Sequence, residues 1–304
     1  MSTATAAPTR PHPELFAPLA HPYYIFTPEY LQTSGGVRAL HYLCHALNLA
    51  GHEAYVTTTS VHPDLRTPIL VEQQLEAHLR SGREPIVVYP EVVSGNPMEA
   101  QNVVRYLLAP DGLHTGVPID LQPDDLVFTF YGPLLPDGWR GDVLTVPLVD
   151  TRIFTSAGVD PADRRGTAMW IHRHLDKGGQ LHPLTADSTE ISFRVPERDA
   201  HELAALLRQV ECLYLYEHSA LTFEALMCGC PVVFIPNEIE ALPRDPAFLD
   251  GHGIAWTPDP AEIARAKATV HLAAERYQRL EREFWTDLNR FVVTTQASAR
   301  ARQL

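Results

Sequence analysis

The chain has 304 residues, of which 45% are hydrophobic and 20% are charged, and its formal net charge is −13. This length and composition exclude a wholly disordered protein and suit two medium-sized domains. The excess of 37 acidic over 24 basic side chains argues against a nucleic-acid-binding protein, because such proteins need a basic face. No apolar run approaches the roughly 20 residues that span a bilayer, so we expect no transmembrane segment, with peripheral membrane contact left open.

The first 22 residues are rich in Ala, Thr and Pro and lack the apolar centre of a signal peptide. We therefore expect a flexible N-terminal arm over 1–22 and a cytoplasmic protein. Four cysteines, Cys44, Cys212, Cys228 and Cys230, lie in apolar stretches without the spacing of zinc ligands. They are expected to be buried, reduced thiols that pack as small apolar residues.

The chain order of strands and helices predicts an α/β fold. Residues 23–27 are typical of a strand, 37–50 carry apolar residues at helical spacing up to Gly51, and 54–58 are typical of a second strand. A strand, a helix and a strand within about 35 residues indicate a parallel βαβ unit. The same reasoning predicts further strands over 85–89, 126–130 and 143–149, and further helices over 71–80 and 98–108.

A second α/β run begins near residue 168. Its predicted strands are 169–172, 191–193, 212–216 and 231–235, with helices over 199–210 and 219–227 and a polar turn over 174–179. A long helical pattern, with room for one break, then runs from residue 261 to about 291. We expect it either to pack locally or to cross back and tie the two halves together.

These patterns divide the chain into domains over 23–150 and 151–260, followed by a C-terminal helical segment over 261–304. Both domains are expected to be doubly wound and Rossmann-like. Ligands of such sheets bind at the carboxyl ends of the strands, so two facing sheets predict a site in the cleft between them.

The segment 214–231 holds the densest group of candidate functional residues. Glu217 follows a predicted strand, a helix begins near Ser219, and Glu224 lies in that helix. The free N–H groups at a helix start favour an anion such as phosphate. The two carboxylates suit the hydroxyls of a ribose or a hexose. The alternative is that Ser219 only caps the helix and Glu224 faces water.

This segment also resembles a known motif. Glu224-Ala225, followed by the glycine and proline of 228–233, is similar to the nucleotide-sugar-binding passage of the retaining GT-B glycosyltransferases of the group 1 class. Gly35-Gly36 before a predicted helix resembles the family's N-terminal passage, where a glycine pair admits the donor pyrophosphate. One departure is the spacing of Glu217 and Glu224, which is one residue shorter than the family's, whose strict position is taken here by Tyr216.

The resemblance implies a GT-B-like fold, with an acceptor-side N-terminal domain, a nucleotide-sugar-binding C-terminal domain and a last helix that crosses back to the N-terminal domain. It implies that a basic turn holds the donor phosphates. The implied donor-binding residues are Gly35, Gly36, Arg173, Lys177, Glu217, Ser219, Ala220, Leu221 and Glu224. For the acceptor side, Glu91 at the end of a predicted strand is the best-placed carboxylate and His114 is the second catalytic candidate.

We therefore predict a glycosyltransferase that moves a sugar from a nucleotide-sugar donor to a glycan or other carbohydrate acceptor, as in polysaccharide biosynthesis. Retention of configuration follows from the resemblance. The sequence has no Asp-x-Asp pair and no His/Cys cluster with metal spacing, so no metal and no cofactor are expected. The alternatives are a degenerate relative that binds a sugar nucleotide or a partner without turnover, and a nucleotide-sugar 2-epimerase, which needs no acceptor.

Overall fold

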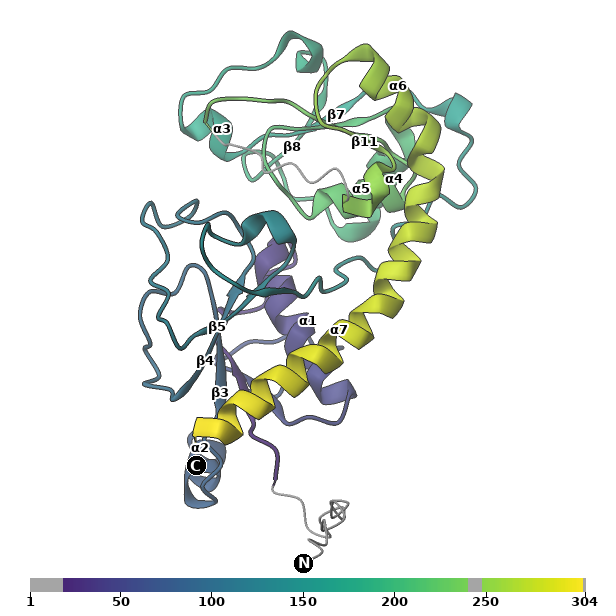
Figure 1. Ribbon diagram of the computed structural model, residues 1–304. Helices are drawn as coiled ribbons and strands as arrows, with labels where there is room; N and C mark the ends of the chain where they lie inside the picture. Colours follow the sequence, from purple (N-terminus) through teal and green to yellow (C-terminus); the bar gives the residue numbers. More distant parts are fainter. Residues whose placement is uncertain (1–18, 240–247, 303–304) are drawn as a thin grey trace, which may run out of the picture.

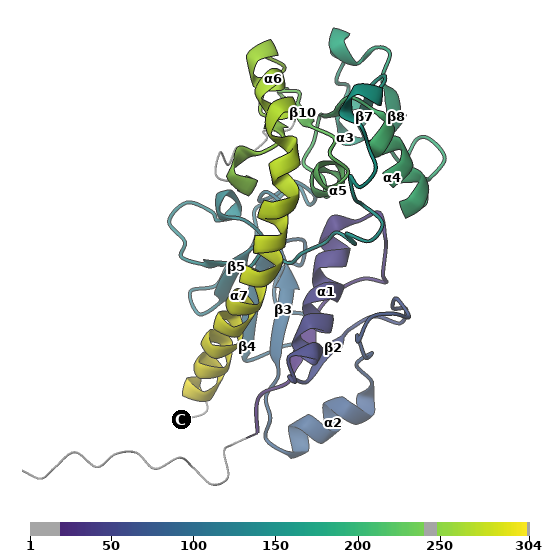
Figure 2. The ribbon, with the colours of Figure 1, turned by 90° about the vertical axis from the view of Figure 1, so that its right-hand side faces the viewer.

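The structure is a computed structural model that describes residues 19–239 and 248–302. Two α/β units lie one above the other, and a long C-terminal helix runs along both (Figure 1). Turning the molecule by 90° shows that this helix continues from the second unit down to the first (Figure 2). The predicted class, two doubly wound α/β domains with a returning C-terminal helix, is confirmed.

The first unit is built on a six-stranded parallel sheet with the order β2-β1-β3-β4-β5-β6. Its strands are β1 (Tyr23–Ile25), β2 (Ala54–Val56), β3 (Ile86–Pro90), β4 (Asn102–Leu107), β5 (Leu126–Thr129) and β6 (Asp142–Val143). Its helices are α1 (Gly35–Leu49), α2 (Glu72–Arg80) and a short 3-10 helix over Gly132–Leu134. Strands β1, β3 and β4 are buried along their whole length, as expected where a parallel sheet is covered on both faces.

The second unit has a five-stranded parallel sheet with the order β11-β10-β9-β7-β8. Its strands are β7 (Ala168–Trp170), β8 (Thr189–Ile191), β9 (Leu213–Leu215), β10 (Val232–Phe234) and β11 (Ile254–Ala255). Its helices are α3 (Arg173–Asp176), α4 (Ala200–Gln209), α5 (Leu221–Met227) and α6 (Pro260–Thr269), with 3-10 turns over Pro161–Asp163, Pro183–Thr185, Phe248–Gly251 and Val270–Leu272. The last strand of the first sheet, β6, ends at Val143, and the first strand of the second sheet, β7, begins at Ala168.

Local sequence signals explain the ends of the main helices. The Ser34 side chain caps α1 by accepting from the Val37 amide, and Gly51 follows that helix with a φ of 85°. A left-handed residue of this kind favours glycine because a Cβ would be strained there. Asp199 and Glu202 form a reciprocal capping box at the start of α4. The predicted helices over 71–80 and 199–210 are confirmed.

The helix predicted over 98–108 is wrong. The chain turns there up to Gln101 and then forms the buried strand β4. Asn96, taken as a helix cap, instead closes a turn by bonding both the N–H and the carbonyl of Ala100. The β-branched pair Val103-Val104 fits a sheet buried on both faces. The strand predicted over 143–149 is also too long, because β6 ends at Val143.

The polar turn predicted over 174–179 contains the one-turn helix α3. The long C-terminal pattern is broken once, as expected, at Val270–Leu272, and then forms α7 (Ala273–Arg302). Tyr277 of α7 contacts Phe223 of the second unit, and its hydroxyl accepts a hydrogen bond from the Val149 amide at 2.9 Å. Farther along α7, Phe291 packs on Tyr23 in the first unit.

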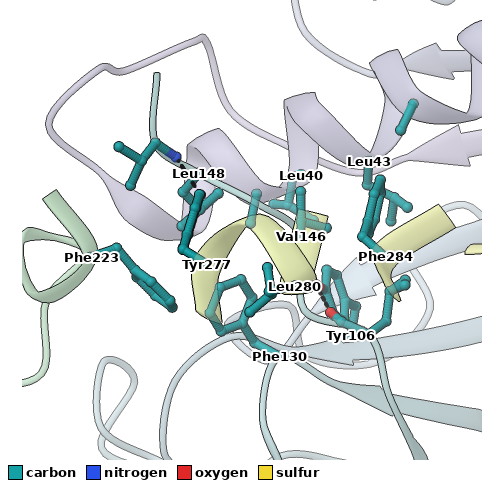
Figure 3. Close-up of a cluster of buried hydrophobic side chains, with 14 of the residues drawn as sticks. Leu40, Leu43, Tyr106, Phe130, Val146, Leu148, Phe223, Tyr277, Leu280 and Phe284 are labelled. Atoms are coloured by element: carbon teal, nitrogen blue, oxygen red, sulfur yellow. Dashed lines mark hydrogen bonds between the residues drawn. The ribbon is translucent and has the colours of Figure 1, made fainter. Parts of the chain in front are cut away.

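Side chains from both units meet on α7. Figure 3 shows Leu40 and Tyr106 of the first unit, Phe223 of the second, and Tyr277, Leu280 and Phe284 of α7 in one buried cluster. Removing apolar surface from water is the main favourable term in folding. The cluster is therefore the apolar connection between the two units, and the crossing-back interpretation of the tail is confirmed.

The four cysteines are buried and form no disulfide. Burial raises the pKa of the Cys44 thiol to about 12, which keeps it protonated and unreactive. Most of the predicted arm over 1–22 lies outside the described residues. Within the described ranges, every helix is too short or too polar to cross a bilayer.

Candidate functional site at the domain junction

Both sheets change direction beside their first strand. Strand β1 lies between β2 and β3, and β7 lies between β8 and β9, so consecutive connections leave on opposite sides. Ligands of open α/β sheets bind outside the carboxyl ends of the strands at such switch points. The segments that follow β1, β7 and β9 contain the glycine pair, the basic turn and the two glutamates predicted from the sequence. The structure therefore places these predicted residues at the carboxyl edges of the two sheets.

One glycine of the pair, Gly35, lies against the second unit. Gly35 and Gly36 are the first two residues of α1. A Cβ atom added to Gly35 would lie only 2.9 Å from the Cβ of Ala220. A Cβ on Gly36 would lie at an ordinary 3.8 Å from Leu108 of its own unit. Gly35 therefore permits a close approach of the two units that a larger residue would prevent.

Glu224, predicted to bind sugar hydroxyls, forms an ion pair across the junction instead. Its Oε1 accepts from Nη1 of Arg38 at 2.7 Å, and the two side chains are only 5% and 4% exposed. Burial disfavours the charge of Arg38, but the Glu224 carboxylate outweighs burial and raises the pKa of the guanidinium. The alternative in which Glu224 faces water is wrong, because the side chain is buried.

Glu217 is fully buried and holds the basic turn. Its Oε1 accepts from the amides of His172 and His174 at 2.9 and 2.8 Å, and its Oε2 lies 3.1 Å from Arg173. A carboxylate that receives two amide N–H groups and a guanidinium fixes the backbone that carries them. The side chain is 0% exposed, so Glu217 determines how Arg173 is presented rather than forming a surface of the site.

The basic turn lies close to the second catalytic candidate. Burial lowers the pKa of His114, and the charges of Arg173 and Lys177 lower it further. His114 belongs to the first unit, whereas Arg173 and Lys177 follow β7 of the second. The charges of Arg173 and Lys177 thus reach His114 of the other unit, and the lowered pKa favours its neutral form. The two permanent cations of the turn, Arg173 and Lys177, favour an anionic ligand in an otherwise acidic protein.

The start of α5 completes the junction. Ser219 Oγ accepts from the Leu221 amide at 3.2 Å and so closes a turn just before α5. The N-cap of α5 is Ala220, without a side-chain cap hydrogen bond, so the interpretation of Ser219 as the helix cap is wrong. Ala220 is the residue that meets Gly35. Leu221 is buried in the core.

Glu91 lies at another position on the carboxyl edge of the first sheet. Its carboxylate accepts from the Leu108 amide at 2.9 Å and so links the ends of β3 and β4. Burial raises the pKa of Glu91, while hydrogen bonds from backbone amides, that of Leu108 foremost, oppose the shift. A raised pKa favours the protonated form of a carboxyl group and is one mark of a possible general acid or base.

Three residues of the junction escaped the sequence analysis. Arg38 lies beside the apolar stripe of α1 and carries no motif that marks it. His218 contacts Tyr131 of the first unit, with 3.5 Å between Tyr131 Oη and His218 Nε2. Its ring also packs on Phe234. A polar residue directly after Glu217 was the only signal for His218, and nothing in the sequence indicated its partner.

No group of three or more His, Cys, Asp or Glu side chains in 19–239 and 248–302 could hold a metal ion. A surface cavity of about 370 Å³ lies away from the junction, at the amino edge of the second sheet, beside Arg164, Lys267 and His271. Lys267 is paired there with Glu211, and the Arg164 guanidinium donates to backbone carbonyls.

No family model and no curated protein matches the sequence. Among solved structures, the chain is similar to the glycosyltransferase SnogD from Streptomyces nogalater, with 17% identity, a TM-score of 0.46, and coverage of 91% of this chain and 100% of that one. It is also similar to an alpha-glucosyltransferase in complex with UDP and DNA (12%, 0.44, 87% and 94%). A third is the spinosyn rhamnosyltransferase SpnG complexed with thymidine diphosphate (14%, 0.39, 87% and 96%).

Proposed function

We propose that this protein is a glycosyltransferase that takes a sugar from a nucleotide-sugar donor and passes it to a glycan or another carbohydrate acceptor. The observation that carries the proposal is the basic turn at the carboxyl end of β7, in a protein with a net charge of −13. Glu217 holds this turn through the amides of His172 and His174, and the charges of Arg173 and Lys177 reach His114 of the other unit. A nucleoside diphosphate is the anion that doubly wound sheets typically hold.

The donor phosphates would bind Arg173 and Lys177, and Glu217 would keep Arg173 in place from behind. A guanidinium matches phosphate oxygens because its N–H groups form a planar fork. The N-terminus of α1, with Gly35 and Gly36, would add free amide groups on the opposite side. Glu224 would accept hydroxyls of the ribose or the sugar once its ion pair with Arg38 is rearranged.

The transfer would proceed without a metal ion. In that case the protein's cations and helix N-termini stabilise the charge that grows on the departing diphosphate. Retention of configuration would follow if the leaving diphosphate itself assists the acceptor hydroxyl. The acceptor hydroxyl would lose its proton to a phosphate oxygen of the leaving diphosphate or, alternatively, to the carboxylate of Glu91 or the imidazole of His114 as general base.

The first experiment is a thermal-shift screen of the wild-type protein with UDP, thymidine diphosphate, GDP, ADP and CMP, each with and without EDTA. A ligand that binds only the native state raises the melting temperature by mass action. We expect one nucleotide to stabilise the protein equally in EDTA. Replacing Arg173 with Ala should abolish the shift, whereas Arg290→Ala, at an exposed position of α7, should preserve it. If no nucleotide shifts the wild type, the proposal is wrong.

Product analysis then separates the alternatives. The nucleotide sugar that binds is incubated with the protein, with and without a panel of oligosaccharide acceptors, and the products are identified by mass spectrometry and NMR. A new glycosidic bond that appears only with an acceptor supports the transferase. An epimerised donor without acceptor would identify a 2-epimerase. Binding without any product would indicate a protein that only binds sugar nucleotides.

A further inference from the structure

The contact between Gly35 and Ala220 closes the place where the proposed donor would bind. The space between these residues has no room for one additional carbon atom, since a Cβ on Gly35 would lie 2.9 Å from Ala220 Cβ. A phosphate group is larger than a methyl group. A donor held between the start of α1 and the start of α5 therefore requires the two units to separate at this contact.

The ion pair of Arg38 and Glu224 holds the same contact together. Arg38 lies three residues after Gly35 in α1, and Glu224 lies four residues after Ala220 in α5. Their side chains are almost fully buried and 2.7 Å apart. Nη1 of Arg38 also lies 3.4 Å from the carbonyl of Leu148. A buried charge that loses its partner is costly, so the pair strongly favours the arrangement in which the units touch.

The hydrogen bonds of Arg38 are incomplete in this arrangement. Its Nε is buried and has no hydrogen-bond partner, in a side chain that is only 4% exposed. An unpaired buried donor lowers the stability of the state that contains it. Water can reach Nε once the units separate, so the closed junction carries a cost that opening relieves.

We propose that Arg38 is a positioning residue of the donor site, which holds the Glu224 carboxylate across the junction and keeps the site shut until a ligand separates Gly35 from Ala220. This inference rests on the proposed function for the identity of the ligand. The closed contact itself depends only on the geometry of the junction. It can therefore be tested without any nucleotide.

The test measures the distance between the units by electron paramagnetic resonance in the full-length protein. Spin labels are placed at Glu76→Cys in α2 and Asp187→Cys in the second unit, both at exposed positions. The four native thiols are buried and should remain unlabelled. We expect one narrow distance distribution for the ligand-free protein with its native junction.

Two matched glycine variants test the steric fit between Gly35 and Ala220. Gly35→Ala forces a methyl group against Ala220 and should lengthen and broaden the distribution. Gly36→Ala adds the same atoms to the neighbouring residue, at ordinary distance from Leu108, and should leave the distribution unchanged. Equal distributions for both variants and the native junction would overturn the inference. Circular dichroism and a cooperative thermal transition check that each variant is folded.

Charge variants test the ion pair. Arg38→Met and Glu224→Gln should each lengthen the distance, and the exchanged pair Arg38→Glu with Glu224→Arg should restore at least part of the closed population. A merely structural role for Arg38 in α1 would not be rescued by a change 186 residues away. If Arg38→Met unfolds the chain, the more conservative Glu224→Gln and the exchanged pair decide the question.

UDP at millimolar concentration is the ligand probe. In the native junction, UDP should shift the distance distribution towards that of Arg38→Met. If the closed state outnumbers the open state by about ten to one in the wild type, Arg38→Met should bind UDP up to about tenfold more tightly than the wild type does. UDP that stabilises the protein without changing the distance contradicts the inference alone. Distances that respond to the variants, together with no nucleotide binding, support the closed contact and contradict the proposed function.

Discussion

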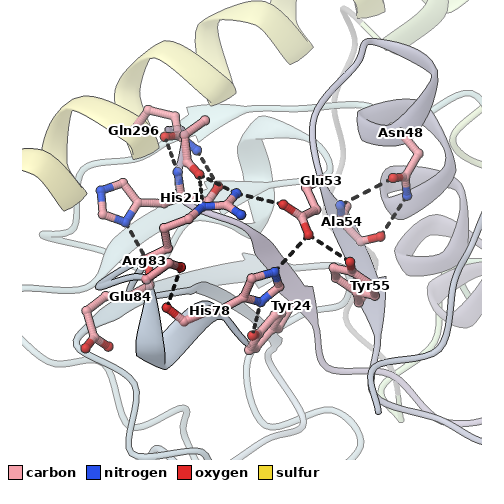
Figure 4. Close-up of polar contacts among 12 residues, drawn as sticks. His21, Tyr24, Asn48, Glu53, Ala54, Tyr55, His78, Arg83, Glu84 and Gln296 are labelled. Carbon is pink, nitrogen blue, oxygen red and sulfur yellow. Dashed lines mark hydrogen bonds and ion pairs between the residues drawn. The ribbon is translucent and has the colours of Figure 1, made fainter. Parts of the chain in front are cut away.

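Two polar networks lie at opposite edges of the first sheet. At the amino edge, Glu53 accepts from His78, Tyr55 and Arg83, all within one unit (Figure 4). At the carboxyl edge, Arg38 reaches Glu224 in the other unit. The first network can form as soon as the first sheet folds. The second forms only when the two units dock. Disrupting the second network therefore tests the docking of the units, whereas disrupting the first tests the stability of the first unit.

The surroundings of the two networks also differ. Glu53 is about one-third exposed, and its neighbours in Figure 4 include His21, which exchanges two backbone hydrogen bonds with Gln296 of α7. That edge is therefore tied to the C-terminal helix as well. The Arg38–Glu224 pair is almost dry and faces the second unit. A buried ion pair is sensitive to the loss of either partner, whereas a partly exposed one is screened by water.

The largest expected effect comes from breaking the junction. Arg38→Met leaves the Glu224 carboxylate buried without its partner, and we expect a loss of about 3–5 kcal/mol in the free energy of unfolding. Urea denaturation measures this change. The control is Arg152→Met, whose side chain is 88% exposed and pairs with Asp150. Its cost should be about 0–1 kcal/mol. A similar small cost at Arg38 would mean that the pair adds little to docking.

The next effect concerns the link between the junction and the basic turn. Glu217→Ala removes the acceptor of the His172 and His174 amides, and each unpaired buried group costs about 1–3 kcal/mol. We expect faster hydrogen exchange over residues 172–177 and loss of the nucleotide-induced thermal shift. Glu217→Gln, which keeps an acceptor oxygen, should recover part of both. A normal exchange pattern in Glu217→Ala would refute the positioning role of this carboxylate.

A smaller effect is expected at the amino edge, where the contribution of Glu53 to stability should depend on pH. Partial burial alone would raise the pKa of Glu53, but hydrogen bonds from His78, Tyr55 and Arg83 and the charge of Arg83 lower it to about 2 from 4.5. Its contribution to stability is therefore fully present above pH 4.5 and is lost as the pH falls towards 2.

The corresponding measurement compares the melting temperatures of wild type and Glu53→Gln at pH 6, 4 and 3. The wild type should be more stable at pH 6, and the difference should shrink with decreasing pH. Glu76→Gln, at an exposed position of α2, serves as the control with little difference at any pH. A gap that stays constant between pH 6 and 3 would show that the charge of Glu53 is not what stabilises the network.

The smallest effect on stability is expected at the rim of the junction. Lys177 is exposed, so Lys177→Ala should change the free energy of unfolding by less than about 0.5 kcal/mol. Its affinity for the nucleotide found in the screen should nevertheless fall several-fold, because one cation near the phosphates is lost. Isothermal titration calorimetry checks the affinity. An unchanged affinity would remove Lys177 from the site while leaving Arg173 in it.

The strands and helices with strong local signals could be predicted from the sequence. The apolar run 85–89 predicts a strand, and Asp199 predicts a helix start, from a few neighbouring residues alone. The segment 98–108 could not, because Val103, Val104 and Tyr106 also occur at helical spacing and Asn96-Pro97 is typical of a helix start. This segment forms the strand β4 because the neighbouring strands β3 and β5 pair with it on both sides.

The candidate site divides in the same way. The glycine pair, the basic turn and Glu217 follow strands and helices that local patterns reveal, and parallel topology alone places them at the carboxyl edges. The partner of Glu224 could not be predicted, since an ion pair between α1 and α5 depends on how two separate units dock. The same holds for the contact of Tyr131 with His218.

The sequence by itself determined the α/β class, the order of most elements and the segments that gather at the carboxyl edges, because these follow from periodicity, capping and the rules of parallel sheets. Only the tertiary structure decided that Gly35 lies against Ala220, that Arg38 forms an ion pair with Glu224 and that Glu217 pairs with Arg173. The physical reason is that local patterns extend over a few residues, whereas burial and charge pairing depend on surfaces that meet only after both units have folded.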